Sequence, residues 1–179
     1  MHDLRPNPEL SLDYCAERPI FADFLEQASR APGATAVISA GAQCSYAQLE
    51  AISRGLAGLL IERGATETDR VVIVASRCAG LVYAMLGALR GGLAFTVADA
   101  AYPAARVDQI IRTLEPAFVL LCGDATVEIK LETPVIRIPE LPAEALQAFA
   151  GDQTLADVDP GRAAYITFTS GSTGEPKGV

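Results

Sequence analysis

The residues best suited to chemistry lie close together near the end of the chain. They share small size, a hydroxyl group or a positive charge: Thr169, Ser170, Gly171, Ser172, Thr173, Gly174 and Lys177. Glycine lacks Cβ, so backbone N–H groups beside it can approach a bound anion closely. Hydroxyl groups add hydrogen-bond donors, and a lysine adds a compact cation. This composition predicts a loop that binds the phosphates of a nucleotide.

A strand is expected to lead into this loop. Residues 165–169 alternate in polarity and are rich in aromatic and β-branched side chains, which favour strands. The loop does not fit the pattern G-x-x-x-x-G-K-[ST], because Glu175 and Pro176 follow Gly174. Pro176 and Gly178 are also poor residues for the helix that should follow such a loop. A different kind of phosphate loop is therefore predicted; the alternative is a mobile glycine and serine loop with a solvated lysine nearby.

Composition and net charge indicate a globular chain and argue against nucleic-acid binding. With 179 residues and 50% hydrophobic content, the chain is long and apolar enough to form a sizeable core. Its net charge is −8 and its calculated pI about 4.6, with no run of lysine or arginine. Such a chain repels a phosphate backbone overall, so we expect no nucleic-acid partner.

The numbers and spacing of cysteine and histidine argue against two kinds of site. The four cysteines form no C-x-x-C pair and His2 is the single histidine, so neither a zinc site nor a Ser-His-Asp triad is expected. We expect reduced thiols at Cys15, Cys44, Cys78 and Cys122, as in a cytoplasmic protein.

No targeting or membrane segment is predicted. The first residues lack the basic start and apolar core of a signal peptide. The most apolar window, residues 81–98, is interrupted by Arg90, Gly91 and Gly92, so it favours a buried helix and strand over a membrane span.

Hydrophobic periodicity predicts alternating strands and helices. Residues 1–18 are expected to be an irregular leader. Strands are expected at 36–39, 71–76, 94–98, 117–122 and 135–138. Helices are expected at 45–64, 79–90, 103–114 and 142–149, and a first helix is expected to start at Pro19 and to stop at Pro32. Residues 71–76 form a continuous β-branched run, typical of a strand buried on both faces. The alternation predicts an α/β fold with a mainly parallel sheet covered by helices.

Three stretches resemble motifs of one enzyme superfamily. TSGSTGEPKG (residues 169–178) closely resembles the phosphate-binding signature of the adenylate-forming enzymes, which include acyl-CoA synthetases, luciferases and the adenylation domains of nonribosomal peptide synthetases. CSYAQLE (44–50) and RGGLAFTVADAAYPAAR (90–106) resemble two earlier adenylation-domain motifs, in the same order. Val97 and Ala100 stand where synthetase domains usually have proline, and this second stretch also resembles aminoadipate reductases.

The resemblance implies a fold and an activity. Residues 19–179 would be the N-terminal part of an AMP-binding (adenylation) domain, truncated at the phosphate loop. The whole enzyme would use ATP to convert a carboxylic or amino acid into an acyl- or aminoacyl-adenylate and pyrophosphate. It would then pass the acyl group to the phosphopantetheine thiol of a carrier protein or domain. The chain alone is expected to be inactive and marginally stable.

The resemblance also assigns roles to residues. The seven loop residues named above would bind the ATP phosphates. The Mg²⁺ ligand, the adenine pocket, the acid-selecting residues and the catalytic lysine are expected outside the chain, so no catalytic residue is expected within it.

Two other interpretations remain open. One is an acyl-CoA synthetase or an aminoadipate-reductase-like adenylation domain; the other, of a different class, is a small non-catalytic module that binds a nucleotide or phosphate.

The earlier motifs also have a structural interpretation. Ser45 would cap a helix, and Asp99, Tyr102 and Arg106 would fix a turn between a strand and a helix.

Overall fold

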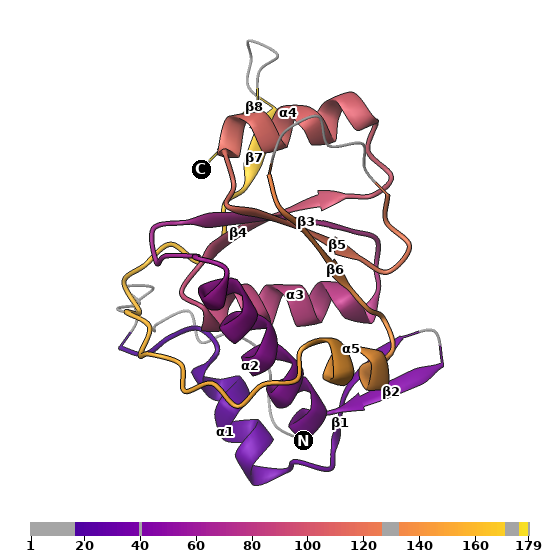
Figure 1. Ribbon diagram of the computed structural model, residues 1–179, viewed down its shortest axis with the longest axis vertical. Coiled ribbons are helices and arrows are strands. Elements are labelled where there is room, and N and C mark those ends of the chain that lie inside the picture. Colours follow the sequence, from indigo (N-terminus) through magenta and orange to yellow (C-terminus); the bar gives the residue numbers. More distant parts are fainter. Residues whose placement is uncertain (1–16, 40, 127–132, 171–175, 179) are drawn as a thin grey trace, which may run out of the picture.

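A parallel sheet with helices on both faces forms the centre of the fold (Figure 1). The computed structural model describes residues 17–39, 41–126, 133–170 and 176–178. The sheet contains β3 (Arg70–Ala75), β4 (Ala94–Asp99), β5 (Phe118–Cys122) and β6 (Val135–Ile138), in the spatial order β4-β3-β5-β6. All three pairings between these strands are parallel. The predicted fold class is confirmed.

The helices divide between the two faces. Helix α4 (Ala104–Leu114) covers one face, while α2 (Tyr46–Glu62) and α3 (Ala79–Arg90) cover the other. The shorter helices α1 (Ala22–Arg30) and α5 (Pro142–Ala148) pack against α2. These helices lie within the predicted ranges.

Alternation along β3 builds a separate core on each face. Val71 and Ile73 belong to the cluster beneath α2 and α3, whereas Val72 and Val74 belong to the cluster beneath α4. All four side chains are at most 1% exposed. Burying each such side chain contributes about 1.5–3 kcal/mol relative to leaving it in water. The β-branched run predicted this two-sided burial correctly.

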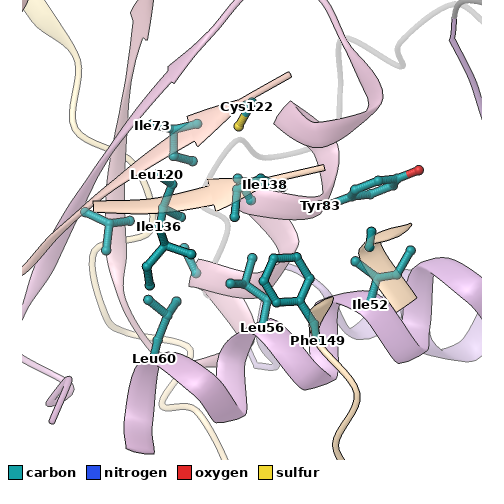
Figure 2. Close-up of a cluster of buried hydrophobic side chains, with 14 of the residues drawn as sticks. Ile52, Leu56, Leu60, Ile73, Tyr83, Leu120, Cys122, Ile136, Ile138 and Phe149 are labelled. Carbon is teal, nitrogen blue, oxygen red and sulfur yellow. The ribbon is translucent and has the colours of Figure 1, made fainter. Parts of the chain in front are cut away.

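Figure 2 shows the larger core, in which α2 faces the sheet. Ile52, Leu56 and Leu60 of α2 belong to the same buried cluster as sheet residues such as Ile73 and Leu120. The glycines of α2 and α3 allow close helix packing: an ideal Cβ on Gly87 of α3 would lie 2.6 Å from a methyl carbon of Leu56.

One polar side chain and the thiols are part of this core. Tyr83 is fully buried and donates a 3.4 Å hydrogen bond from its hydroxyl to the Glu140 carbonyl. Burial raises the pKa of the Tyr83 hydroxyl above its ordinary value, and neighbouring Cys44 adds to the shift. Cys44, Cys78 and Cys122 are free thiols, as expected, and burial raises the pKa of the Cys44 and Cys122 thiols. Cys15 lies outside the described residues.

The start of α2 is fixed by a capping box at Ser45, the residue expected from the sequence to cap this helix. The Ser45 hydroxyl accepts a 3.2 Å hydrogen bond from the Gln48 N–H, and the Gln48 side chain accepts a 2.9 Å bond from the Ser45 N–H. Two N–H groups that have no partner within the helix are thereby satisfied. Beyond the other end of α2, Gly64 follows the C-cap residue Arg63 and has φ +93°, the left-handed conformation typical of a glycine at C′.

Ser45→Ala is expected to lower the free energy of unfolding by about 1 kcal/mol, because the Gln48 N–H loses its acceptor. Urea denaturation followed by circular dichroism measures the change. Ser45→Asp restores a side-chain acceptor and should recover most of the loss. Equal midpoints for Ser45→Ala and the unsubstituted chain would contradict a stabilising capping box.

The structure adds pairings that the sequence did not predict. β2 (Ala42–Ser45) pairs antiparallel with β1 (Thr35–Ser39), next to Gly41 with φ +78°. Near the end of the chain, β7 (Phe168–Ser170) pairs antiparallel with β8 (Pro176–Gly178). The strand expected at 165–169 is therefore displaced towards the loop, and a second strand follows the loop at Pro176–Gly178.

Candidate functional site

The β7–β8 hairpin carries the two ends of the predicted phosphate loop. Its register places Thr169 opposite Lys177 and Ser170 opposite Pro176. The hairpin thus brings the backbones of Thr169, Ser170 and Lys177 together, although Lys177 lies eight positions after Thr169 in the sequence. Four other predicted ligands, Gly171, Ser172, Thr173 and Gly174, lie in the connection at 171–175, outside the described residues. Their role remains a prediction.

The segment leading into β7 is held by the outer edge of β4. The Phe95 N–H donates to the Ala164 carbonyl at 3.1 Å, and the Ile166 N–H donates to the Phe95 carbonyl at 2.8 Å. Between these two bonds, Tyr165 forms a parallel bridge with Phe95, and their rings pack with centroids 5.2 Å apart. The chain therefore extends the central sheet by one short pairing before it reaches the hairpin.

The next residues rest on the α4 side of the sheet. Ile166 and Phe168 are half-buried and pack against the apolar cluster to which α4 contributes. That cluster contains the α4 residues Val107, Ile110, Ile111 and Leu114. β8 also lies against α4, and the hairpin projects beside this helix (Figure 1). The hairpin thus sits at one face of the sheet, away from α2 and α3.

A tight turn connects β4 to α4. The Asp99 carboxylate accepts a 2.8 Å hydrogen bond from the Ala101 N–H, and the Asp99 carbonyl accepts one of 2.9 Å from the Tyr102 N–H. The Arg106 guanidinium donates at 3.4 Å to the Gln109 side chain, one turn along the helix. The contacts of Asp99 and Tyr102 agree with the structural interpretation of these residues, whereas the Arg106 bond lies within α4 and does not span the turn.

Sequence reasoning missed the residues that anchor the hairpin. Phe95, Ile166 and Phe168 were assigned to strands, but their mutual placement was not predicted. The alternation of residues 165–169 contained a usable signal, because it predicted opposite faces for Tyr165 and Ile166. It did not indicate which element each face would meet.

A buried network around Arg90 lies on the opposite side of the sheet from the hairpin. The buried Arg90 guanidinium donates to the Glu50 carbonyl at 2.8 Å and the Ser53 hydroxyl at 3.0 Å, and pairs with the Glu50 carboxylate at 3.0 Å. Burial lowers the pKa of Arg90, and the neighbouring Glu50 carboxylate opposes this shift. This network joins α2 to α3 on the face of the sheet that the hairpin does not touch.

A surface hollow of about 520 Å³ lies between the start of α1 and residues 152–158. Arg54 and Arg90 line it, but Arg54 pairs with Glu50 and Asp152, and Arg90 pairs with Glu50. Because both guanidinium groups already have carboxylate partners, the hollow lacks the free positive charge that a phosphate requires.

Metal-binding clusters and membrane-spanning helices are absent from the described part of the chain. Within it, no three histidine, cysteine or acidic side chains are grouped so that they could hold a metal ion. None of the helices there combines the length and apolar character needed to cross a membrane.

Comparison with known proteins identifies the class to which this α/β fold and loop belong. The family model described as AMP-binding enzyme matches residues 24–179. The chain therefore belongs to the AMP-binding enzyme family, and the resemblance to adenylate-forming enzymes is confirmed.

Its relatives include nonribosomal peptide synthetases and related synthases. Syringomycin synthase SyrB1 of Pseudomonas syringae pv. syringae is 41% identical over 159 residues, covering 87% of this chain and 25% of SyrB1. Phenyloxazoline synthase MbtB of Mycolicibacterium paratuberculosis is 36% identical over 160 residues, covering 87% of this chain and 13% of MbtB. The AMPPNP-bound structure of the nonribosomal peptide synthetase FmoA3 superposes with a TM-score of 0.79 at 28% identity, covering 93% of this chain and 17% of FmoA3. The chain thus spans a quarter or less of each of these proteins.

Proposed function

We propose that this chain is the N-terminal part of an ATP-dependent enzyme that activates carboxylic or amino acids. In the reaction, a carboxylate oxygen attacks the α-phosphorus of ATP, an acyl- or aminoacyl-adenylate forms, and pyrophosphate leaves. The observation that carries the proposal is the AMP-binding family match over residues 24–179, which ends on the predicted phosphate loop. The domain is proposed to begin near residue 19, after a leader at 1–18, and to continue beyond Val179.

The loop is proposed to bind the β- and γ-phosphates of ATP. Its donors suit an anion of this size, because they combine N–H groups beside glycines, four hydroxyl groups and Lys177. The hairpin register supports this role, because Thr169 and Lys177 lie opposite each other at the base of the loop. Donors held in place before the reaction stabilise the charge that develops on departing pyrophosphate, without reacting covalently. Mg²⁺ would supply further charge neutralisation, through ligands outside this chain.

The acceptor of the acyl group is proposed to be the phosphopantetheine thiol of a carrier protein or domain. Support comes from relatives that are peptide synthetases or synthases, among them SyrB1 at 41% identity. An acyl-CoA synthetase or an aminoadipate-reductase-like enzyme remains the alternative within the same chemistry. A cytoplasmic location, predicted from the cysteines, belongs to the same proposal.

Exchange of labelled pyrophosphate into ATP tests the activation step. The full-length polypeptide that carries this chain should catalyse exchange that depends on an added acid, whereas the 179-residue chain alone should not. A panel of amino, aryl and fatty acids covers the possible substrates, and reactions without acid are the control. Absence of exchange with every acid would overturn the proposal and favour a non-catalytic nucleotide-binding module.

A further inference from the structure

The phosphate-loop hairpin is attached to the stretch 90–106, which the proposed reaction does not otherwise use. This part of the chain supplies β4 and the beginning of α4. We propose that Phe168 is a positioning residue: by packing against the α4 cluster, it fixes the β7–β8 hairpin and thereby the place where the loop holds the ATP phosphates. This inference rests on the function proposed above and assigns that site a residue that does not touch ATP.

Phe168 occupies the first position of β7, directly before Thr169. It pairs with Gly178 across the hairpin, so the partner strand offers only a hydrogen atom at this position. The Phe168 side chain is half-buried and packs against the cluster that contains Val107, Ile110 and Ile111 of α4. On the incoming strand, it is the apolar side chain nearest in sequence to the loop.

The hairpin depends on such a contact because it is very short. Its ladder contains three residue pairs, and an isolated two-stranded ribbon is at best marginally stable in water. The Ile166 N–H, two residues before Phe168, donates the second of the two hydrogen bonds that join the incoming segment to β4. From Phe168 onward, packing of the Phe168 side chain on the α4 cluster and the position of β8 beside that helix hold the hairpin in place.

Removal of the Phe168 ring should therefore move the loop relative to the remainder of the active site. Small displacements of groups that bind a reacting substrate are costly, because rate depends steeply on alignment. For Phe168→Ala we expect the KM for ATP to rise about tenfold. The KM for the acid should remain within about twofold, since the loop is proposed to contact phosphate and not the acid.

The experiment compares three variants of the full-length polypeptide. Phe168→Ala removes the packing, and Phe168→Leu keeps much of the apolar volume, so it should recover most of the ATP affinity. Phe24→Ala is the matched control: Phe24 is also half-buried, but it lies on α1, where its ring packs on Tyr46 with centroids 6.2 Å apart. For each variant, KM for ATP, KM for the acid and the melting temperature are measured together with hydrogen exchange of the Lys177 and Gly178 amides.

A selective effect supports the inference. Phe168→Ala should raise the KM for ATP and speed exchange of these two amides, while Phe24→Ala should lower the melting temperature and change neither. In a Lys177→Ala background, Phe168→Ala should have a smaller effect on the KM for ATP, because both substitutions act through one loop.

Two results would overturn the inference. One is wild-type exchange of the β8 amides in Phe168→Ala; the other is an equal rise in KM for ATP in Phe168→Ala and Phe24→Ala. If Phe168→Ala does not fold, Phe168→Leu decides, with a KM rise of about two- to threefold expected and no rise overturning the positioning role. If the unsubstituted polypeptide forms no adenylate, the proposed function fails, while amide exchange still decides whether Phe168 holds the hairpin.

Discussion

Replacement of Lys177 by alanine in the full-length polypeptide is expected to slow adenylate formation about ten- to a hundredfold, with little change in stability. If Lys177 contacts the ATP phosphates, the substitution removes a charge-assisted hydrogen bond worth about 1–3 kcal/mol, and each 1.4 kcal/mol corresponds to a factor of about ten in rate. The register of the hairpin supports this role, because it brings Lys177 opposite Thr169 at the base of the loop.

The measurement is adenylation kinetics over an ATP titration, beside a thermal melt. Arg30→Ala provides a control, because Arg30 is an exposed cation in the last turn of α1, on the other side of the sheet. Its removal should leave the kinetics unchanged and alter stability by no more than about 0.5 kcal/mol. Unchanged kinetics for Lys177→Ala as well would mean that this lysine is a solvated surface charge.

Much of the central fold could be predicted because local pattern and tertiary environment agree. The run at 71–76 is apolar at every position but the last, and β3 is indeed buried on both faces. The apolar stripe of α4 and the cap at Ser45 were equally predictable from the sequence, since each depends on residues within a few positions of one another. The end of α3 at Arg90 follows from the two glycines that come after it.

The hairpins were harder to predict because their strands are short and lack a strong local preference. β2 has four residues and β8 only three, including Pro176 and Gly178, which are both disfavoured in strands. What makes β8 a strand is its pairing with β7. Such a pairing is a tertiary contact, and the sequence of β8 alone carries no sign of it.

The candidate site was also only partly predictable from the sequence. A phosphate-binding role could be predicted from hydroxyl groups, glycines and a lysine within nine residues, because donors for a phosphate must be close together. Its support was not evident, since Phe95 and Ile166 meet across a sheet edge although they lie far apart in the chain. This contact joins the segment that leads into the loop to Phe95, within the stretch 90–106.

Gly55→Ala is expected to destabilise the chain by about 3 kcal/mol or more, the largest change in stability that we anticipate. An ideal Cβ on Gly55 would lie 1.7 Å from the Phe149 carbonyl oxygen and 2.8 Å from its carbonyl carbon. Both are backbone atoms, so no side-chain rotation can relieve the overlap, and forced expansion of a packed core typically costs about 1–3 kcal/mol or more. Alanine favours helix over glycine by about 1 kcal/mol, which offsets only part of this cost.

Urea denaturation of Gly55→Ala, with Gly33→Ala as the control, measures the effect. No atom lies within 4 Å of an ideal Cβ on Gly33, so that variant should stay within about 0.5 kcal/mol of the unsubstituted chain. The buried Phe149 ring is part of the α2 and α3 core, so displacement of its backbone by the new methyl group should also disturb that core. Near-ultraviolet circular dichroism should register the disturbance as a loss of aromatic signal. An unchanged unfolding midpoint would show instead that the end of α5 can move away from α2 at little cost.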